Sequence, residues 1–139
     1  MLASGLRGVV PMLEGFPIHA TVAASDIERA KDWYREKLGV TPKKEVMGNL
    51  WFEFAPGTWL LVYQTEQAGT ARNTQGGWTV KDLPAVVEHL RGRGVEFEEY
   101  DFGEMKTEDG ILTVPGMGSS AWFKDSEGNI FELTDPATS

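Results

Sequence analysis

The 139-residue sequence predicts an α+β protein in which two βαβββ modules form a cupped mixed sheet with the helices on its convex face. The first observation behind this fold class is that strands and helices follow in the same order in the two halves of the chain. The second is that short sequences recur in the same order in both halves. Asp26-Ile27 matches Asp82-Leu83 at an offset of 56 residues, and Trp51-Phe52 matches Trp122-Phe123 at an offset of 71.

In the first half, apolar residues alternate in short runs and then recur at helical spacing. The pattern predicts a helix over 26–38 and strands over 18–24, 41–47, 50–54 and 59–64. Ser25 with Glu28 three residues later is typical of a capping box at the start of this helix. Gly39 fits its C-terminal cap, where a glycine is often needed.

The same order recurs in the second half. The pattern predicts a strand over 77–80, a helix over 82–93, a strand over 95–102, a long loop over 103–118 with a short strand at 111–114, and a hairpin of strands 120–124 and 129–134. We therefore expect one domain over 16–135. Its modules span about 16–65 and 75–135, between a flexible N-terminal extension (1–15) and a tail (136–139).

Charge and composition limit the classes of function. The chain has 13 basic and 21 acidic side chains, a formal net charge of −8 and no cysteine. An acidic surface repels phosphate backbones, so a nucleic-acid partner is not expected. Without cysteine there is no disulfide, thiolate nucleophile or Cys-ligated zinc. No apolar run approaches the roughly 20 residues that span a bilayer, so no membrane partner is expected, and a cytoplasmic location is the simplest expectation.

The repeat also predicts where a site would lie. A βαβββ unit covers one sheet face with its helix, and two units side by side make a trough from their remaining faces. Equivalent positions in the two modules then face each other across the trough. They are His19 and Gln75 before the helices, and Leu61 and Glu132 in the last strands. Alternation along the last strand of the first module adds Trp59 and Tyr63.

The residues at both ends of the predicted domain resemble a known family. The segment 121–133 (AWFKDSEGNIFEL), and the opening 19–26 with its helix bearing Trp33-Tyr34 and Leu38-Gly39, are similar to the vicinal oxygen chelate superfamily. This superfamily holds glyoxalase I, bleomycin and fosfomycin resistance proteins and extradiol dioxygenases, and the similarity covers about 16–135. It implies paired βαβββ modules, often in a dimer whose pockets use both chains.

The resemblance also implies a set of metal-ligand positions. Metal-binding members take ligands from the first and last strand of each module, which here are His19, Leu61, Gln75 and Glu132. His19 and Glu132 suit a divalent cation, Gln75 is a weak ligand and Leu61 is none. We therefore expect no cofactor, with a divalent metal completed by water as the alternative.

Three functions follow from these expectations. The first is a protein that binds a small hydrophobic or aromatic compound, to sequester or sense it, and lacks the full metal-ligand set. The compound would be held by His19, Trp59, Leu61, Tyr63 and Gln75. This protein would be a homodimer. The alternative is a divalent-metal- or Glu132-dependent lyase, isomerase or dioxygenase acting on a carbonyl or vicinal-oxygen substrate, with Glu132 as general base. An enzyme here would be a glyoxalase-like lyase or isomerase. The third is a protein-interaction module with a filled pocket.

The aromatic residues could bind a ligand or stabilise the fold. Trp59 and Tyr63 could stack on a flat ligand or pack into a core. Trp51 and Trp122 occupy equivalent positions in the repeat, which favours a structural role for both. Trp78 is expected in the core or at an interface.

Overall fold

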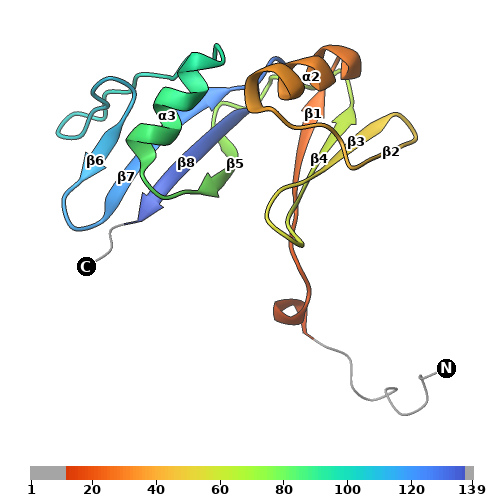
Figure 1. Cartoon of the computed structure of the whole chain (residues 1–139), viewed down its shortest axis with the longest axis horizontal. Helices are drawn as coiled ribbons and strands as arrows, with labels where there is room; N and C mark the ends of the chain where they lie inside the picture. The colour runs from red at the N-terminus through yellow and green to blue at the C-terminus, as the bar shows by residue number, and fades with distance from the viewer. Residues whose placement is uncertain (1–11, 137–139) are drawn as a thin grey trace.

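A computed structural model describes residues 12–136 (Figure 1). Residues 1–11 of the predicted extension (1–15) and 137–139 of the predicted tail (136–139) therefore lie outside the described residues. After a short turn of helix η1 (Leu13–Gly15), the first module contains β1 (Ala20–Ala24), α2 (Ile27–Trp33), the π-helical η2 (Tyr34–Leu38), β2 (Lys44–Val46), β3 (Asn49–Glu53) and β4 (Trp59–Gln64). The second contains β5 (Thr74–Thr79), α3 (Leu83–Gly92), β6 (Leu112–Val114), β7 (Gly118–Lys124) and β8 (Ile130–Pro136). No helix within 12–136 is long and apolar enough to cross a membrane.

The strands form two four-stranded sheets with the same internal order. The first is β1-β4-β3-β2 and the second is β5-β8-β7-β6, and in each sheet one parallel pair is followed by antiparallel pairs. The edge strands β1 and β5 adjoin, since a Cβ placed on Gly76 would lie 3.5 Å from the Cβ of Ala20. Helices α2 and α3 lie on the same side of the molecule (Figure 1). The predicted fold class, two βαβββ modules in an α+β architecture, is confirmed.

The strand register confirms the repeat at single-residue resolution. Trp51 pairs with Leu61 across β3 and β4, and Trp122 pairs with Glu132 across β7 and β8. Leu61 and Glu132 therefore occupy equivalent positions, as predicted from their place four residues after the hairpin glycines Gly57 and Gly128.

The first helix starts one residue later than the capping box predicts. The N-cap is Asp26, whose carboxylate accepts a hydrogen bond from the Arg29 N–H at 3.0 Å. Ser25 is not the cap, because its N–H and hydroxyl both donate to the Glu127 carboxylate of the other module. The C-terminal prediction is confirmed, with Gly39 in the left-handed region at φ 72°.

The predicted strand at 95–102 is wrong. This segment makes only isolated bridges, and β6, which corresponds to the short strand predicted within the long loop, takes the edge position beside β7. The chain curls because the Glu99 carboxylate accepts hydrogen bonds from the Thr107 hydroxyl at 2.6 Å and the Gly110 N–H at 3.1 Å. The hydrogen bond from Thr107 lowers the pKa of Glu99. A local side-chain network thus replaces the ladder of a strand.

One hydrophobic core spans both modules on the side of the helices. It is formed by alternate residues of the inner strands together with one stripe of each helix: Val22, Leu50, Phe52 and Val62 of the first sheet, Ala121, Phe123, Phe131 and Leu133 of the second, and Tyr34, Leu83 and Val87 of the helices. Because strand side chains alternate, the residues between these point to the opposite side of each sheet. We call that opposite side the helix-free face.

The β7–β8 turn fixes one module against the other. The Glu127 carboxylate lies under the N-terminus of α2, where it accepts hydrogen bonds from the N–H groups of Ser25 and Asp26 and pairs with Arg29 at 2.8 Å. Burial opposes its ionisation, but hydrogen bonds from Arg29, Ser126 and Asp26 prevail and lower the pKa of Glu127 to about 2. An ionised carboxylate at a helix N-terminus is also favoured by the helix dipole.

A second contact completes this joint. The buried Tyr34 hydroxyl donates to the Asp125 carboxylate at 2.7 Å. Burial raises the pKa of Asp125, although hydrogen bonds from Asn129 and Tyr34 oppose the rise. The Asn129 side chain also donates to the Ala23 carbonyl of β1 at 2.8 Å. The β7–β8 turn is therefore bonded to both β1 and α2, which sets how the two helix-free faces lie relative to each other.

Candidate functional site

The helix-free face of the first module carries a group of aromatic rings under one cation. The ring centroids of His19 and Trp51 lie 5.2 Å apart, and those of Trp51 and Trp59 lie 6.2 Å apart in an edge-to-face arrangement. The Lys44 ammonium lies 5.4 Å from the Trp51 centroid and 5.6 Å from the Trp59 centroid. We call these four residues the tryptophan cluster.

The register of three strands assembles this cluster. Lys44 of β2 pairs with Trp51 of β3, and Trp51 pairs with Leu61 of β4. Directly paired residues point to the same face of a sheet, so a cation, an indole ring and an aliphatic side chain form one row. Trp51 and Trp59 are half-buried and Lys44 is exposed, which leaves an aromatic surface that is accessible to a ligand.

The second module carries its own aromatic group, the tyrosine cluster, formed by Tyr100, Phe102 and Trp122. The Tyr100 centroid lies 5.4 Å from that of Trp122 and 5.7 Å from that of Phe102. These rings line a pocket of about 240 Å³ whose other walls are Arg72, Asn73, Thr74 and Ile130. Burial and the nearby Glu98 carboxylate raise the pKa of Tyr100, so its hydroxyl stays a neutral donor and acceptor.

The structure places the predicted ligand-binding residues on two modules. His19, Trp59 and Leu61 meet in and beside the tryptophan cluster, and Tyr63 follows on the same strand with 39 % of its surface exposed. Gln75 lies apart from them, at a bulge in β5, where its amide oxygen accepts a hydrogen bond from the Ile130 N–H at 3.3 Å.

The four metal-ligand positions implied by the resemblance offer a poor donor set for a divalent cation. Leu61 has no donor atom, and the Gln75 amide oxygen is engaged with the backbone of β8. His19 and Glu132 remain, and no hydrogen bond joins these two side chains. Within residues 12–136 no group of three or more histidine and carboxylate side chains is close enough to hold a metal ion. These residues do not fit the metal that the family implies, and we derive no chemistry through one.

Gly77 allows the close approach of β5 to Glu132. A Cβ at this position would overlap the Glu132 carbonyl oxygen. We expect Gly77→Ala to lower the free energy of unfolding by about 2 kcal/mol, because the added methyl must push β5 away from β8. Urea unfolding measures this. Gly92→Ala, in a helix with nothing near the added methyl, is the control and should be neutral or slightly stabilising. Equal stability of the two variants would contradict the expectation.

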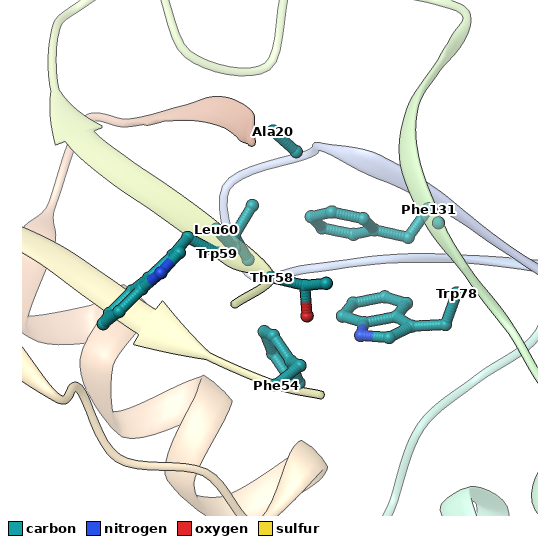
Figure 2. Close-up of a pocket in the computed structure, with 8 residues that line it drawn as sticks. Ala20, Phe54, Thr58, Trp59, Leu60, Trp78 and Phe131 are labelled. Atoms are coloured by element: carbon teal, nitrogen blue, oxygen red, sulfur yellow. The ribbon is translucent and has the colours of Figure 1, made fainter. Parts of the chain in front are cut away.

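A smaller cavity lies between the modules on the side of the core. It measures about 90 Å³ and is lined by Ala20, Phe54, Thr58, Trp59, Leu60, Gly77, Trp78 and Phe131. Figure 2 shows the rings of Trp78, Phe131 and Phe54 around this space, with Trp59 at its far side. Trp78 packs against Phe54, Phe123 and Phe131 and belongs to the core, as predicted. The cavity is well below the roughly 300 Å³ of typical ligand sites, so we assign no ligand to it.

Several residues in and beside the two clusters are not predicted from the sequence. Lys44 and Arg72 gave no signal, because a single cation in a strand or linker has no pattern. Tyr100 and Phe102 were assigned only to a strand. The equivalence of Trp51 and Trp122 was the available signal, and it predicts a structural role. Both side chains lie half-buried on the helix-free face among other aromatic rings, and the structural role stays a prediction.

Comparison with known proteins bears on this site. The family model of the Glyoxalase/Bleomycin resistance protein/Dioxygenase superfamily matches residues 17–133. No curated protein matches the sequence. Among solved structures, TnmS3, an antibiotic binding protein from Streptomyces sp. CB03234, is 23% identical with a TM-score of 0.66, covering 93% of this chain and 98% of that one.

Two further structures are similar. A glyoxalase / bleomycin resistance protein from Catenulispora Acidiphila DSM 44928 is 22% identical with a TM-score of 0.64, covering 88% of this chain and 99% of that one. The fosfomycin resistance protein FosX from Listeria monocytogenes, complexed with Mn(II) and sulfate ion, is 18% identical with a TM-score of 0.62, covering 86% and 89%. Identities this low show a common fold and leave the ligand of this chain to its own residues.

Proposed function

Because this chain belongs to the Glyoxalase/Bleomycin resistance protein/Dioxygenase superfamily, we propose that it binds a small hydrophobic or aromatic compound on its helix-free face, sequestering or sensing it without a metal. The observation that carries this proposal is the pair of aromatic clusters on that face. Each presents half-buried tryptophan rings near an exposed cation, which is Lys44 in the tryptophan cluster and Arg72 in the wall of the pocket beside the tyrosine cluster. Accessible indole and phenyl faces give a flat ligand a large contact area.

The chemistry of the site supports binding more than catalysis. The positions that hold the metal in metal-binding relatives supply one imidazole and one carboxylate here, His19 and Glu132. Rings outnumber ionisable groups in both clusters. An antibiotic binding protein with the same fold agrees with this reading, because in that protein binding is the stated activity.

The proposal includes a homodimer in the cytoplasm. The tyrosine-cluster pocket of about 240 Å³ is smaller than the 300–1,000 Å³ of typical ligand sites. A second copy that placed its tryptophan cluster opposite this pocket would enlarge and close it. Light scattering of the purified protein should give the mass of two chains, and a monomer at all concentrations would remove this part of the proposal.

Isothermal titration tests the proposed binding directly. Planar compounds with two or three fused rings should bind in the presence of EDTA, with a negative heat-capacity change from apolar burial. Saturable binding of at least one such compound, unchanged in affinity by added zinc or manganese, supports the proposal. Failure of the whole series to bind without metal, or consumption of the bound compound during the titration, would refute it.

A further inference from the structure

The tryptophan cluster has an uncompensated positive charge. The Lys44 ammonium contacts the rings of Trp51 and Trp59, and within residues 12–136 no carboxylate lies within ion-pair distance of it. Its neighbours in the chain differ. Lys43 pairs with Glu53 at 3.6 Å, and Glu45 pairs with Lys31 at 2.7 Å. The charges on both sides of Lys44 are thus each paired with another residue, while the charge of Lys44 itself is left free on the aromatic surface.

Other groups on this face agree with a local preference for anions. His19 adds a ring N–H donor on the same indole, 5.2 Å from Trp51 between centroids. On the strands of the first module, Glu53 is the acid that shares this face, paired in register with Trp59, whereas Glu132 lies on the helix-free face of the second module. The charge of Glu53 is compensated by Lys43, and its carboxylate also accepts a hydrogen bond from the Gly57 N–H at 3.2 Å.

We infer that the ligand of the helix-free face is an aromatic acid, whose carboxylate binds Lys44 while its ring system contacts Trp51 and Trp59. This inference rests on the proposed function and specifies its ligand class. The chain carries a net charge of −8, so most of its surface repels an anion. A free ammonium beside half-buried indoles reverses that repulsion at one place. There it offers a charge-assisted hydrogen bond next to apolar contact area.

The test compares two compounds that share a ring system and differ in charge, 2-naphthoate and 2-naphthamide. In isothermal titration at low ionic strength, the wild-type protein should bind the carboxylate about tenfold more tightly than the amide. This preference should shrink in high salt, which screens exposed charges. Lys44→Met keeps an unbranched apolar side chain over the indoles and should remove the preference, so that the carboxylate binds no more tightly than the amide.

Lys81→Met is the matched control. It changes the net charge by the same amount, but Lys81 lies in the second module, just before α3, so the preference should persist. Equal affinities in the wild-type protein, or a preference that survives Lys44→Met, would overturn the inference, while binding of the amide would still support the proposed function. If neither compound binds the wild-type protein, this inference fails, while the proposed function is decided separately by the wider series of planar compounds.

Discussion

Replacing Glu127 by glutamine lowers the free energy of unfolding by about 3 kcal/mol at neutral pH, the largest effect that we expect from one conservative substitution in this chain. The physical reason is the low pKa of the carboxylate, about 2 against 4.5 without the fold. Each pKa unit corresponds to about 1.4 kcal/mol of preference for the ionised form in the folded state. Glutamine keeps the size of the side chain and loses its pairing with Arg29.

The pH dependence of this effect has a definite sign. Because folding depresses the pKa of Glu127, its contribution is complete above pH 4.5 and is lost as the pH falls toward 2. The difference between wild type and Glu127→Gln should therefore shrink from about 3 kcal/mol at pH 7 to about 1 kcal/mol at pH 3. Asp125 contributes with the opposite sign, since its pKa is raised in the fold. It is present in both proteins, so it cancels in the difference.

Urea unfolding of the wild-type protein and Glu127→Gln at several pH values measures this difference in the free energy of unfolding. Glu66→Gln, an exposed glutamate in the linker between modules, is the matched control and should change stability by less than about 0.5 kcal/mol. A stability difference between wild type and Glu127→Gln that is independent of pH would show that the joint does not depend on the charge of Glu127.

Replacing either Trp51 or Trp122 by leucine lowers the affinity for an aromatic ligand by about 30-fold. Each tryptophan is the central ring of its cluster: Trp51 contacts His19, Trp59 and Lys44, while Trp122 contacts Tyr100 and Phe102. Central aromatic anchors often contribute 2 kcal/mol or more to binding, which corresponds to this factor. Leucine keeps an apolar side chain and loses the flat surface.

Trp33→Leu is the control for this pair. Trp33 stacks on Phe123 on the side of the helices, with ring centroids 6.2 Å apart, so its loss should reduce stability and leave ligand affinity unchanged. Isothermal titration is the suitable measurement, because its signal does not depend on indole fluorescence. If Trp51→Leu and Trp122→Leu bind within twofold of the wild-type protein, the helix-free face is not the ligand site.

The sequence alone predicts most of the first module and the symmetry of the fold. Strand β4 has its predicted limits, and Gly39 ends the first helical segment as predicted, because alternation, helical spacing and a glycine cap are local signals. The predicted strand at 95–102 is wrong because the alternation of its residues is typical of a strand, while the Glu99 carboxylate accepts hydrogen bonds from residues 8 and 11 positions farther along.

What the sequence by itself determined is the repeat: two modules, their element order, and the equivalence of Leu61 and Glu132 opposite Trp51 and Trp122. Repeats and periodicity are properties of sequence neighbours, so one chain is enough to find them. Only the tertiary structure decided how the modules join and which side chains share the helix-free face. The joint depends on contacts such as that between Ser25 and Glu127, 102 residues apart. The clusters depend on strand register and loop path, which place Lys44 and Tyr100 beside the tryptophans. Long-range packing sets these contacts, and no local pattern encodes them.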